Sequence, residues 1–222
     1  MNKDAIILFI KYPERGGMKT RLAEEIGEDL AFDLTICFMR DIVNTLHSVE
    51  AETIIIGTGS TGKGPPGIFG RSLRLVQRGH DPGERLYNAF ADVFIRGISR
   101  AVLVGGDCPG LSASYVREAF AELDSHDAVI GPVADGGYYL IGLHDRSLSA
   151  EYFRDISWGT SKVLVQTVGK MEDAFMELSL LPQIRLVNSV EDLRFLVEER
   201  AVQARNTLQF IELNRDKLDG ML

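Results

Sequence analysis

The 222-residue chain is 45% hydrophobic, a length and composition that predict one domain, residues 1–222, with a sizeable core. Its 24 basic and 32 acidic residues give a formal net charge of -8, which argues against a nucleic-acid partner because phosphate backbones attract basic surfaces. The two cysteines, Cys37 and Cys108, have neither disulfide-framework nor zinc-ligand spacing, and this pattern suits the reducing cytoplasm.

Seven short apolar runs predict the strands of a sheet. Most of them are apolar throughout, which is typical of parallel strands covered on both faces. The first run is too short to cross a membrane and has no cleavage signal behind it, so we expect a buried strand and no membrane span. The runs are residues 5–10, 53–57, 73–77, 101–105, 128–131, 138–143 and 185–187.

Helical patterns alternate with these runs. Residues 30–46 carry an apolar side chain at every fourth position, and residues 86–94 show a similar stripe. This alternation predicts a three-layer α/β/α fold with a mostly parallel sheet. Residues 138–143 follow residues 128–131 too closely for a crossover helix, so we expect an antiparallel strand there.

Later helix starts and one connection are also marked in the sequence. Ser112 is expected to cap one helix, and Ser189 with Asp192 resembles a capping box with Asp in place of Glu. Helix is expected to continue from there, with interruptions, to about Leu218. The glycine-rich residues 57–67 predict an exposed connection, because such a composition cannot pack a core.

The loop after the first run, residues 11–21, carries four cations and two adjacent glycines. Glycine lets the backbone approach phosphate oxygens, and arginine and lysine add charge and hydrogen bonds, so we favour a phosphate-binding loop over a solvated basic turn. The order Gly-Gly-Met-Lys-Thr superficially resembles a P-loop. A Walker A motif is rejected, because the four-residue spacer and the glycine directly before the lysine are missing.

A carboxylate follows the fourth run: Asp107 comes directly after two glycines, and Pro109 closes the turn. Ligands of open sheets bind at the carboxyl ends of strands, and a carboxylate beside a phosphate needs a cation to offset repulsion. Mg²⁺ or Mn²⁺ suits such oxygen ligands. A metal ligand is one interpretation of Asp107, and a helix cap or turn former is the other, with equal weight from this motif alone.

The segment Asp135-Gly136-Gly137 joins the fifth and sixth runs. A hairpin turn is the simplest interpretation, because Asp-Gly supplies the positive φ angles that tight turns need. The tyrosines that follow, Tyr138 and Tyr139, and a backbone that allows close approach of a ligand slightly favour a binding loop.

Three segments in this order, residues 9–22, 105–109 and 131–142, resemble the DUF2064 family, whose members have the nucleotide-diphospho-sugar transferase (GT-A) type of fold. Residues 77–85 and 156–160 are similar to further segments of that family. The resemblance extends from about residue 5 to residue 195. The family is related to guanylyltransferases that act on molybdopterin and on phospholactate.

The resemblance implies a transferase and assigns roles to particular residues. Asp107, Asp135 and Lys19 would be catalytic. The residues implied to bind nucleotide or phosphate are Lys11, Arg15, Lys19, Thr20, Arg21 and Gly106, and those implied to bind the acceptor are Gly136, Gly137, Tyr138 and Thr160.

One position departs from the family pattern, because Asn188 stands where the family usually has an aspartate. Related uridylyltransferases use an asparagine as the second metal ligand at an equivalent late position. The resemblance therefore implies a metal site made by Asp107 and Asn188, weakened by the loss of one negative charge.

The expected function is metal-dependent glycosyl transfer from a nucleotide-diphospho-sugar to a small-molecule acceptor, with Mg²⁺ or Mn²⁺ bridging the diphosphate. Asp135 would accept the proton of the acceptor hydroxyl, with His80 as the alternative proton carrier. Trp158 would line the acceptor pocket or serve packing alone.

Two alternatives remain open. One is nucleotidyl transfer from a nucleoside triphosphate to a phosphorylated small molecule, and the other is a nucleotide-binding module without turnover. A dinucleotide-dependent oxidoreductase is disfavoured, because the first run is not followed by the G-x-G-x-x-G pattern.

Overall fold

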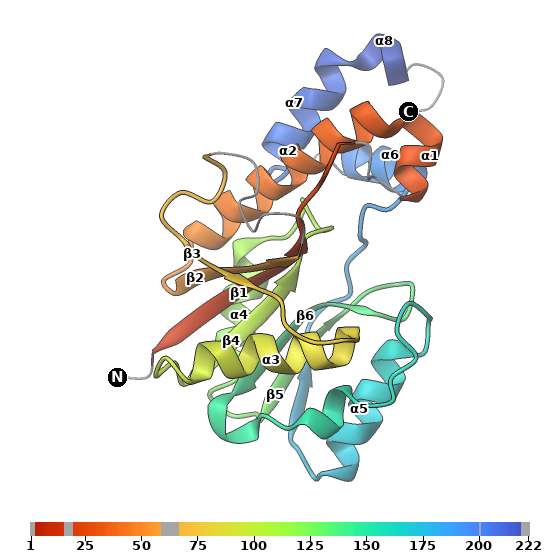
Figure 1. Cartoon of the computed structure of the whole chain (residues 1–222). Coiled ribbons are helices and arrows are strands. Elements are labelled where there is room, and N and C mark those ends of the chain that lie inside the picture. The colour runs from red at the N-terminus through yellow and green to blue at the C-terminus, as the bar shows by residue number, and fades with distance from the viewer. Residues whose placement is uncertain (1–2, 16–19, 59–66, 200, 219–222) are drawn as a thin grey trace.

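The computed structural model describes residues 3–15, 20–58, 67–199 and 201–218, which contain a seven-stranded sheet in the order β3-β2-β1-β4-β6-β5-β7 (Figure 1). The strands are β1 (Asp4–Lys11), β2 (Glu52–Thr58), β3 (Leu73–Val76), β4 (Arg100–Gly105), β5 (Ala128–Pro132), β6 (Tyr138–His144) and β7 (Leu178–Leu180). Neighbouring strands are parallel except for β6, which runs antiparallel to both β4 and β5. The mostly parallel sheet and its antiparallel strand are therefore as expected from the sequence.

Helices cover both faces of the sheet and so form the three predicted layers. They are α1 (Arg21–Ile26), α2 (Glu28–His47), α3 (Pro82–Phe94), α4 (Ala113–Glu122), α5 (Val163–Asp173), α6 (Val190–Glu198), α7 (Arg205–Leu213) and α8 (Arg215–Leu218). Alternate residues of β1 point to opposite faces, so Ile6 and Leu8 pack with α2 and α4, while Ala5 and Ile7 pack with α3. Figure 1 shows α3 and α5 on the near side of the sheet.

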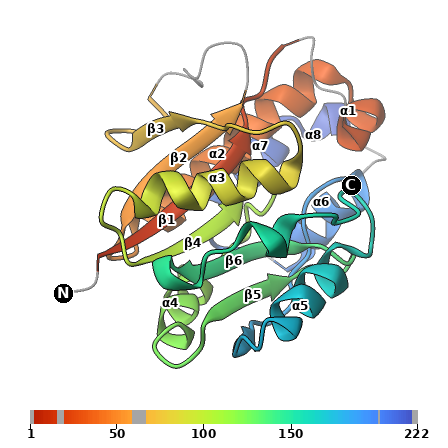
Figure 2. The same ribbon diagram turned by 60° about the horizontal axis from the view of Figure 1, so that its bottom comes forward.

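A third apolar cluster lies beyond the sheet, where α1, α6, α7 and α8 gather around the first half of α2 (Figure 2). Leu34 of α2 packs there with Leu193 of α6 and Ile211 of α7. The buried carboxylate of Asp41 joins α2 to α7, because it accepts four hydrogen bonds of 2.6 to 2.9 Å from the backbone and side chains of residues 206–207. The C-terminal helices are thereby held against α2.

Local signals in the sequence correspond to the observed helix starts. Ser112 accepts a hydrogen bond from Ser114 N at 3.2 Å at the start of α4, and Ser189 and Asp192 form both hydrogen bonds of a capping box at α6. Residues 59–66 of the predicted connection lie outside the described residues. None of the helices in the described part of the chain has both the length and the apolar character needed to cross a bilayer.

One predicted strand is wrong. Residues 185–187 form no strand, and the last strand of the described chain is β7. Pro182 lacks a backbone N–H and follows β7 closely, so the ladder cannot continue through it. Beyond it only Ile184 makes an isolated bridge, to Val133, and the chain then crosses the end of the sheet toward α6.

Candidate functional site

The carboxyl ends of β1 and β4 lie at the same edge of the sheet, because these strands are adjacent and parallel with Phe9 opposite Gly105. Strand β6 is antiparallel to β4, with Leu140 opposite Val104, and therefore begins at that edge. The loops after β1 and β4 and the turn before β6 therefore lie at one edge of the sheet. Open α/β sheets bind ligands at this edge, and all three connections carry predicted site residues.

A cavity of about 290 Å³, here named the Asp107 cavity, opens between the loop after β1 and the end of β4. It brings together three of the residues predicted to bind the nucleotide, namely Lys11, Thr20 and Gly106, and the predicted metal ligand Asp107. A Cβ atom at Gly106 would lie only 2.8 Å from Cγ2 of Ile10. A glycine at this position lets the β4 end pack against β1 and leaves the backbone accessible to phosphate oxygens.

Asp107 is open to solvent on the cavity side. The surrounding protein nevertheless removes much of the water around its carboxyl group, and this desolvation raises the pKa of that group. The backbone carbonyl of Asp107 accepts a hydrogen bond from Val187 N at 2.9 Å. This hydrogen bond brings the next residue, Asn188, close to the Asp107 backbone. Asn188 is exposed.

The predicted cations are not all gathered at this cavity. Arg15 pairs with two aspartates of α2, at 3.0 and 2.6 Å, and Arg21 pairs with Glu25 at 3.0 Å. Neither arginine lines the Asp107 cavity. Lys19, predicted to be catalytic and to bind phosphate, lies outside the described residues.

A second cavity, of about 370 Å³ and here named the Asp135 cavity, holds residues predicted for the acceptor side: Asp135, Gly137, Tyr138, Trp158 and Thr160. The turn before β6 is docked onto the loop before α5. Gly136 has a φ of 87°, and a Cβ atom there would lie 2.2 Å from the Ser161 carbonyl oxygen. The carbonyl of Gly136 also accepts a hydrogen bond from Leu164 N at 2.8 Å.

The polar groups of the Asp135 cavity differ in whether they already make hydrogen bonds within the protein. Asp135 Oδ1 accepts from Gly137 N at 3.0 Å, and Thr160 Oγ1 donates to a backbone carbonyl at 2.7 Å. The Tyr138 hydroxyl is buried beside Thr167 and makes no hydrogen bond of good geometry within the described residues; burial raises its pKa. His80 is exposed and lines neither cavity.

The structure also adds residues that the sequence did not single out. Tyr12 and Met39 line the Asp107 cavity, and the buried Tyr12 hydroxyl has no hydrogen-bond partner among the described residues. Gln77 Nε2 donates to the carbonyls of Ile10 at 2.8 Å and of Ile56 at 3.2 Å, and so joins the ends of β1 and β2. A polar residue at the end of an apolar run was the available signal for Gln77, whereas Met39 lies on a helix and carries no such signal.

Asp107 does not belong to a cluster of metal-binding side chains within the described residues. No group of three or more His, Cys, Asp or Glu side chains gathers anywhere in the described part of the chain, so these residues alone offer no complete cage. Mg²⁺ commonly uses one or two carboxylates together with substrate phosphates and water. The single carboxylate of Asp107 suits an ion of that kind, and the hydrogen bond from Val187 N to the Asp107 carbonyl brings the adjacent residue, Asn188, to the same region.

The fold and the two cavities at the carboxyl ends of the strands define an α/β protein of the nucleotide-diphospho-sugar transferase class. A crystal structure from Desulfovibrio desulfuricans G20, provisionally described as a nucleotide-diphospho-sugar transferase, is 34% identical with a TM-score of 0.90, covering 100% of this chain and 99% of that one. The chain belongs to the family described as an uncharacterized protein conserved in bacteria, DUF2064, whose model matches residues 43–160. The resemblance seen in the sequence is confirmed.

More distant structures share the fold. A cytidylyltransferase from Leptospira borgpetersenii serovar Hardjo-bovis is 14% identical, with a TM-score of 0.59 and coverage of 97% of this chain and 95% of that one. A CMP:2-keto-3-deoxy-manno-octonic acid synthetase complexed with CTP is 11% identical, with a TM-score of 0.50 and coverage of 90% and 100%. At these identities the likeness shows a shared fold. The transferase class expected from the sequence is that of the D. desulfuricans protein. No curated protein matches the chain significantly.

Proposed function

We propose that this protein is a metal-dependent glycosyltransferase that uses a nucleotide-diphospho-sugar donor. The observation that carries the proposal is the pair of cavities at one edge of the sheet, one lined by Lys11 and Asp107 and the other by Asp135 and Thr160. A phosphate-bearing donor and a hydroxyl-bearing acceptor require two compartments that open at the same edge of the sheet. The full-length similarity to the D. desulfuricans protein supports the class of donor.

The donor side of the proposed mechanism rests on the Asp107 cavity. Asp107 and Asn188 would hold Mg²⁺ or Mn²⁺, which supplies Lewis-acid neutralisation of the diphosphate charge when bound. Lys11 donates to a phosphate oxygen. The Thr20 oxygen accepts from Ala23 N at 3.1 Å, so its hydroxyl proton is left to donate to the same ligand. Lys19 is assigned to the charge of the departing diphosphate.

The acceptor side rests on Asp135. One carboxylate oxygen accepts from Gly137 N, which orients the group. The other oxygen takes the proton of the acceptor hydroxyl while that hydroxyl oxygen attacks the sugar carbon. The bond from this carbon to the diphosphate oxygen breaks, and the nucleoside diphosphate leaves with the electron pair.

A thermal-shift panel tests the proposal without knowledge of the acceptor. Nucleotide sugars and nucleoside triphosphates are compared with and without Mg²⁺ or Mn²⁺. A ligand at a hundred times its dissociation constant adds about 2.7 kcal/mol, or roughly 5–10 °C for a chain of this length. Metal-dependent stabilisation by a nucleotide sugar is the expected result.

Other outcomes would support the alternatives. A preference for one triphosphate would favour nucleotidyl transfer to a phosphorylated acceptor. Binding of a nucleotide sugar without any product, even after a broad acceptor screen, would favour a module without turnover.

The site assignment is tested by Asp107→Ala. This variant should lose the metal-dependent part of the shift, because it removes the carboxylate ligand while the exposed position leaves the fold intact. Asp173→Ala, which removes an exposed carboxylate at the end of α5, is the matched control and should behave as the parent protein. Unchanged metal-dependent stabilisation in Asp107→Ala would contradict the assignment.

A further inference from the structure

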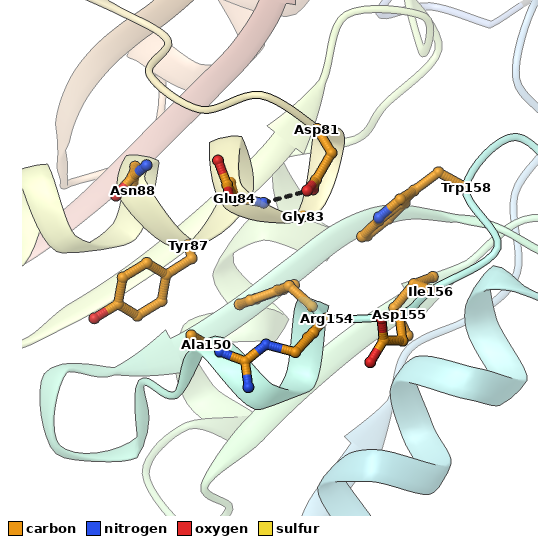
Figure 3. A pocket seen from close by; sticks show the side chains of 11 residues that line it. Asp81, Gly83, Glu84, Tyr87, Asn88, Ala150, Arg154, Asp155, Ile156 and Trp158 are labelled. Carbon is orange, nitrogen blue, oxygen red and sulfur yellow. Dashed lines mark hydrogen bonds between the residues drawn. The ribbon is translucent and has the colours of Figure 1, made fainter.

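A third cavity, of about 540 Å³, lies between the start of α3 and residues 150–158 (Figure 3). Trp158 lines both this cavity and the Asp135 cavity, so the two adjoin at its side chain. We name it the Trp158 cavity. None of the functional roles considered so far uses its other lining residues, which include Asp81, Tyr87 and Asp155.

The Trp158 cavity combines aromatic surface with hydrogen-bond acceptors. Figure 3 shows the Trp158 ring pointing into the cavity, with Tyr87 of α3 on the other side of the opening. Neither the indole N–H nor the Tyr87 hydroxyl makes a hydrogen bond within the described part of the chain, and the Asp155 carboxylate makes none there either. Asp81 uses one oxygen to cap α3, accepting from Glu84 N at 2.9 Å.

This combination matches hydroxyl-rich compounds. Aromatic faces pack against the C–H surface of a sugar ring or polyol, and carboxylates accept hydrogen bonds from its hydroxyl groups. Pockets that bind small molecules are built in this way, from apolar walls with a few polar groups that fix orientation.

The charge of the Trp158 cavity disfavours an anionic ligand. Three carboxylates line it, those of Asp81, Glu84 and Asp155, against the single guanidinium of Arg154. Arg154 is already paired with Glu151, outside the lining. A phosphate group would therefore meet net repulsion here, whereas a neutral ligand would not.

The walls of the cavity are set before any ligand binds. A Cβ atom at Gly83 would lie 2.1 Å from the Phe153 carbonyl oxygen, so the first turn of α3 packs directly on the backbone of the opposite wall. The Phe153 ring in turn stacks on Phe90, with centroids 6.3 Å apart. A preformed cavity needs little ordering on binding, which favours affinity.

We propose that the Trp158 cavity is the distal part of the acceptor site and binds an uncharged, hydroxyl-rich acceptor such as a sugar or polyol. The proposal rests on the proposed function, in which the Asp135 cavity receives the reacting hydroxyl. A site for an uncharged acceptor favours glycosyl transfer to a hydroxyl over nucleotidyl transfer to a phosphorylated acceptor.

The experiment uses the intrinsic fluorescence of Trp158, the only tryptophan of the chain. The protein is titrated, without nucleotide or metal, with mannitol, glucose, maltose and trehalose, and with glucose 6-phosphate as the charged comparison. Ligand-observed NMR of the same mixtures registers binding that leaves the fluorescence unchanged. We expect saturable binding of at least one neutral compound, and binding of glucose 6-phosphate about tenfold weaker than that of glucose, or weaker still.

The variant Asp155→Asn tests whether the neutral ligand binds in the Trp158 cavity. Asp155 has a φ of 54°, which asparagine also tolerates, so Asp155→Asn keeps the backbone, removes the charge and replaces one acceptor oxygen by an NH2 donor. It should weaken binding of the neutral ligand about fivefold and reduce the discrimination against glucose 6-phosphate. Glu172→Gln, an exposed change on α5 outside the cavity, should leave both affinities unchanged.

Three results would overturn the inference: no binding of any neutral compound by either method, tighter binding of glucose 6-phosphate, or identical behaviour of Asp155→Asn and Glu172→Gln. Each leaves intact the donor binding at Asp107, which the thermal-shift panel measures separately. Saccharide binding without any nucleotide binding would instead refute the proposed function and retain a saccharide site in this cavity.

Discussion

Replacing Gly136 by alanine tests how the turn before β6 is held in place. An L-residue at its φ of 87° costs about 1–2 kcal/mol. The new Cβ atom would lie 2.2 Å from the Ser161 carbonyl oxygen, which belongs to the backbone and cannot rotate away. Separating the two loops also removes the hydrogen bond from Leu164 N to the Gly136 carbonyl, worth about 1 kcal/mol. The expected loss of stability is about 2–3 kcal/mol.

Gly159→Ala is the matched control. Gly159 has a φ of 75°, but nothing lies within 4 Å of a Cβ atom built there. This variant should lose only the stability that an L-residue costs at a positive φ, about 1–2 kcal/mol. Differential scanning calorimetry should therefore find Gly136→Ala melting roughly 2–4 °C below Gly159→Ala.

A binding readout links this packing to function. Gly136→Ala should weaken acceptor binding at the Asp135 cavity and leave nucleotide binding at the Asp107 cavity unchanged, because the turn lines only the former. Equal melting temperatures for the two glycine variants would refute the reasoning, since the contact with Ser161 would then contribute nothing.

Three further changes can be tested by chemical denaturation. Tyr12→Phe should stabilise the ligand-free protein by about 1 kcal/mol, because the buried hydroxyl has no hydrogen-bond partner among the described residues. The same change should weaken nucleotide binding. A less stable variant with unchanged nucleotide affinity would contradict this expectation. Asp41→Ala should cost about 3 kcal/mol through its four lost hydrogen bonds, and a loss below about 1 kcal/mol would show that they contribute little. Desolvation raises the pKa of Asp107 above 3.8, so the folded protein binds this proton more tightly than the unfolded chain does. Protonation therefore stabilises the fold below pH 3.8, and this contribution is lost as the pH rises through the raised pKa. Asp107→Asn should therefore be more stable than the parent at pH 7 without metal, by an amount that shrinks toward pH 4; a constant difference would contradict the sign.

The sequence determined the framework of this protein. Continuous apolar runs such as residues 101–105 identify strands that are buried on both faces, and the short distance between β5 and β6 excludes a crossover helix. Because parallel strands end at one edge, the sequence also placed Lys11 and Asp107 at the same edge of the sheet, and the pairing of β1 with β4 in the structure makes their loops neighbours. These conclusions depend on local pattern and strand direction alone.

Tertiary packing determined the structure of segments whose local sequence pattern is weak. Helix α5 was not anticipated, because only Val163, Thr167 and Met171 are buried along it and Gly169 interrupts its interior. The apolar run at residues 185–187 looked like a strand, yet these residues have no ladder partner in the described chain. A short apolar run becomes a strand only where a neighbouring strand offers hydrogen bonds.

Only the tertiary structure decided which polar residues share a cavity. Arg15 and Arg21 stand in the predicted phosphate loop, but nearby carboxylates of α2 and α1 pair with them. Asp81 and Trp158 are far apart in the sequence and line one cavity because α3 packs against residues 150–153. Side-chain pairing and the contact of distant backbone segments depend on the folded chain as a whole, so local sequence patterns do not contain them.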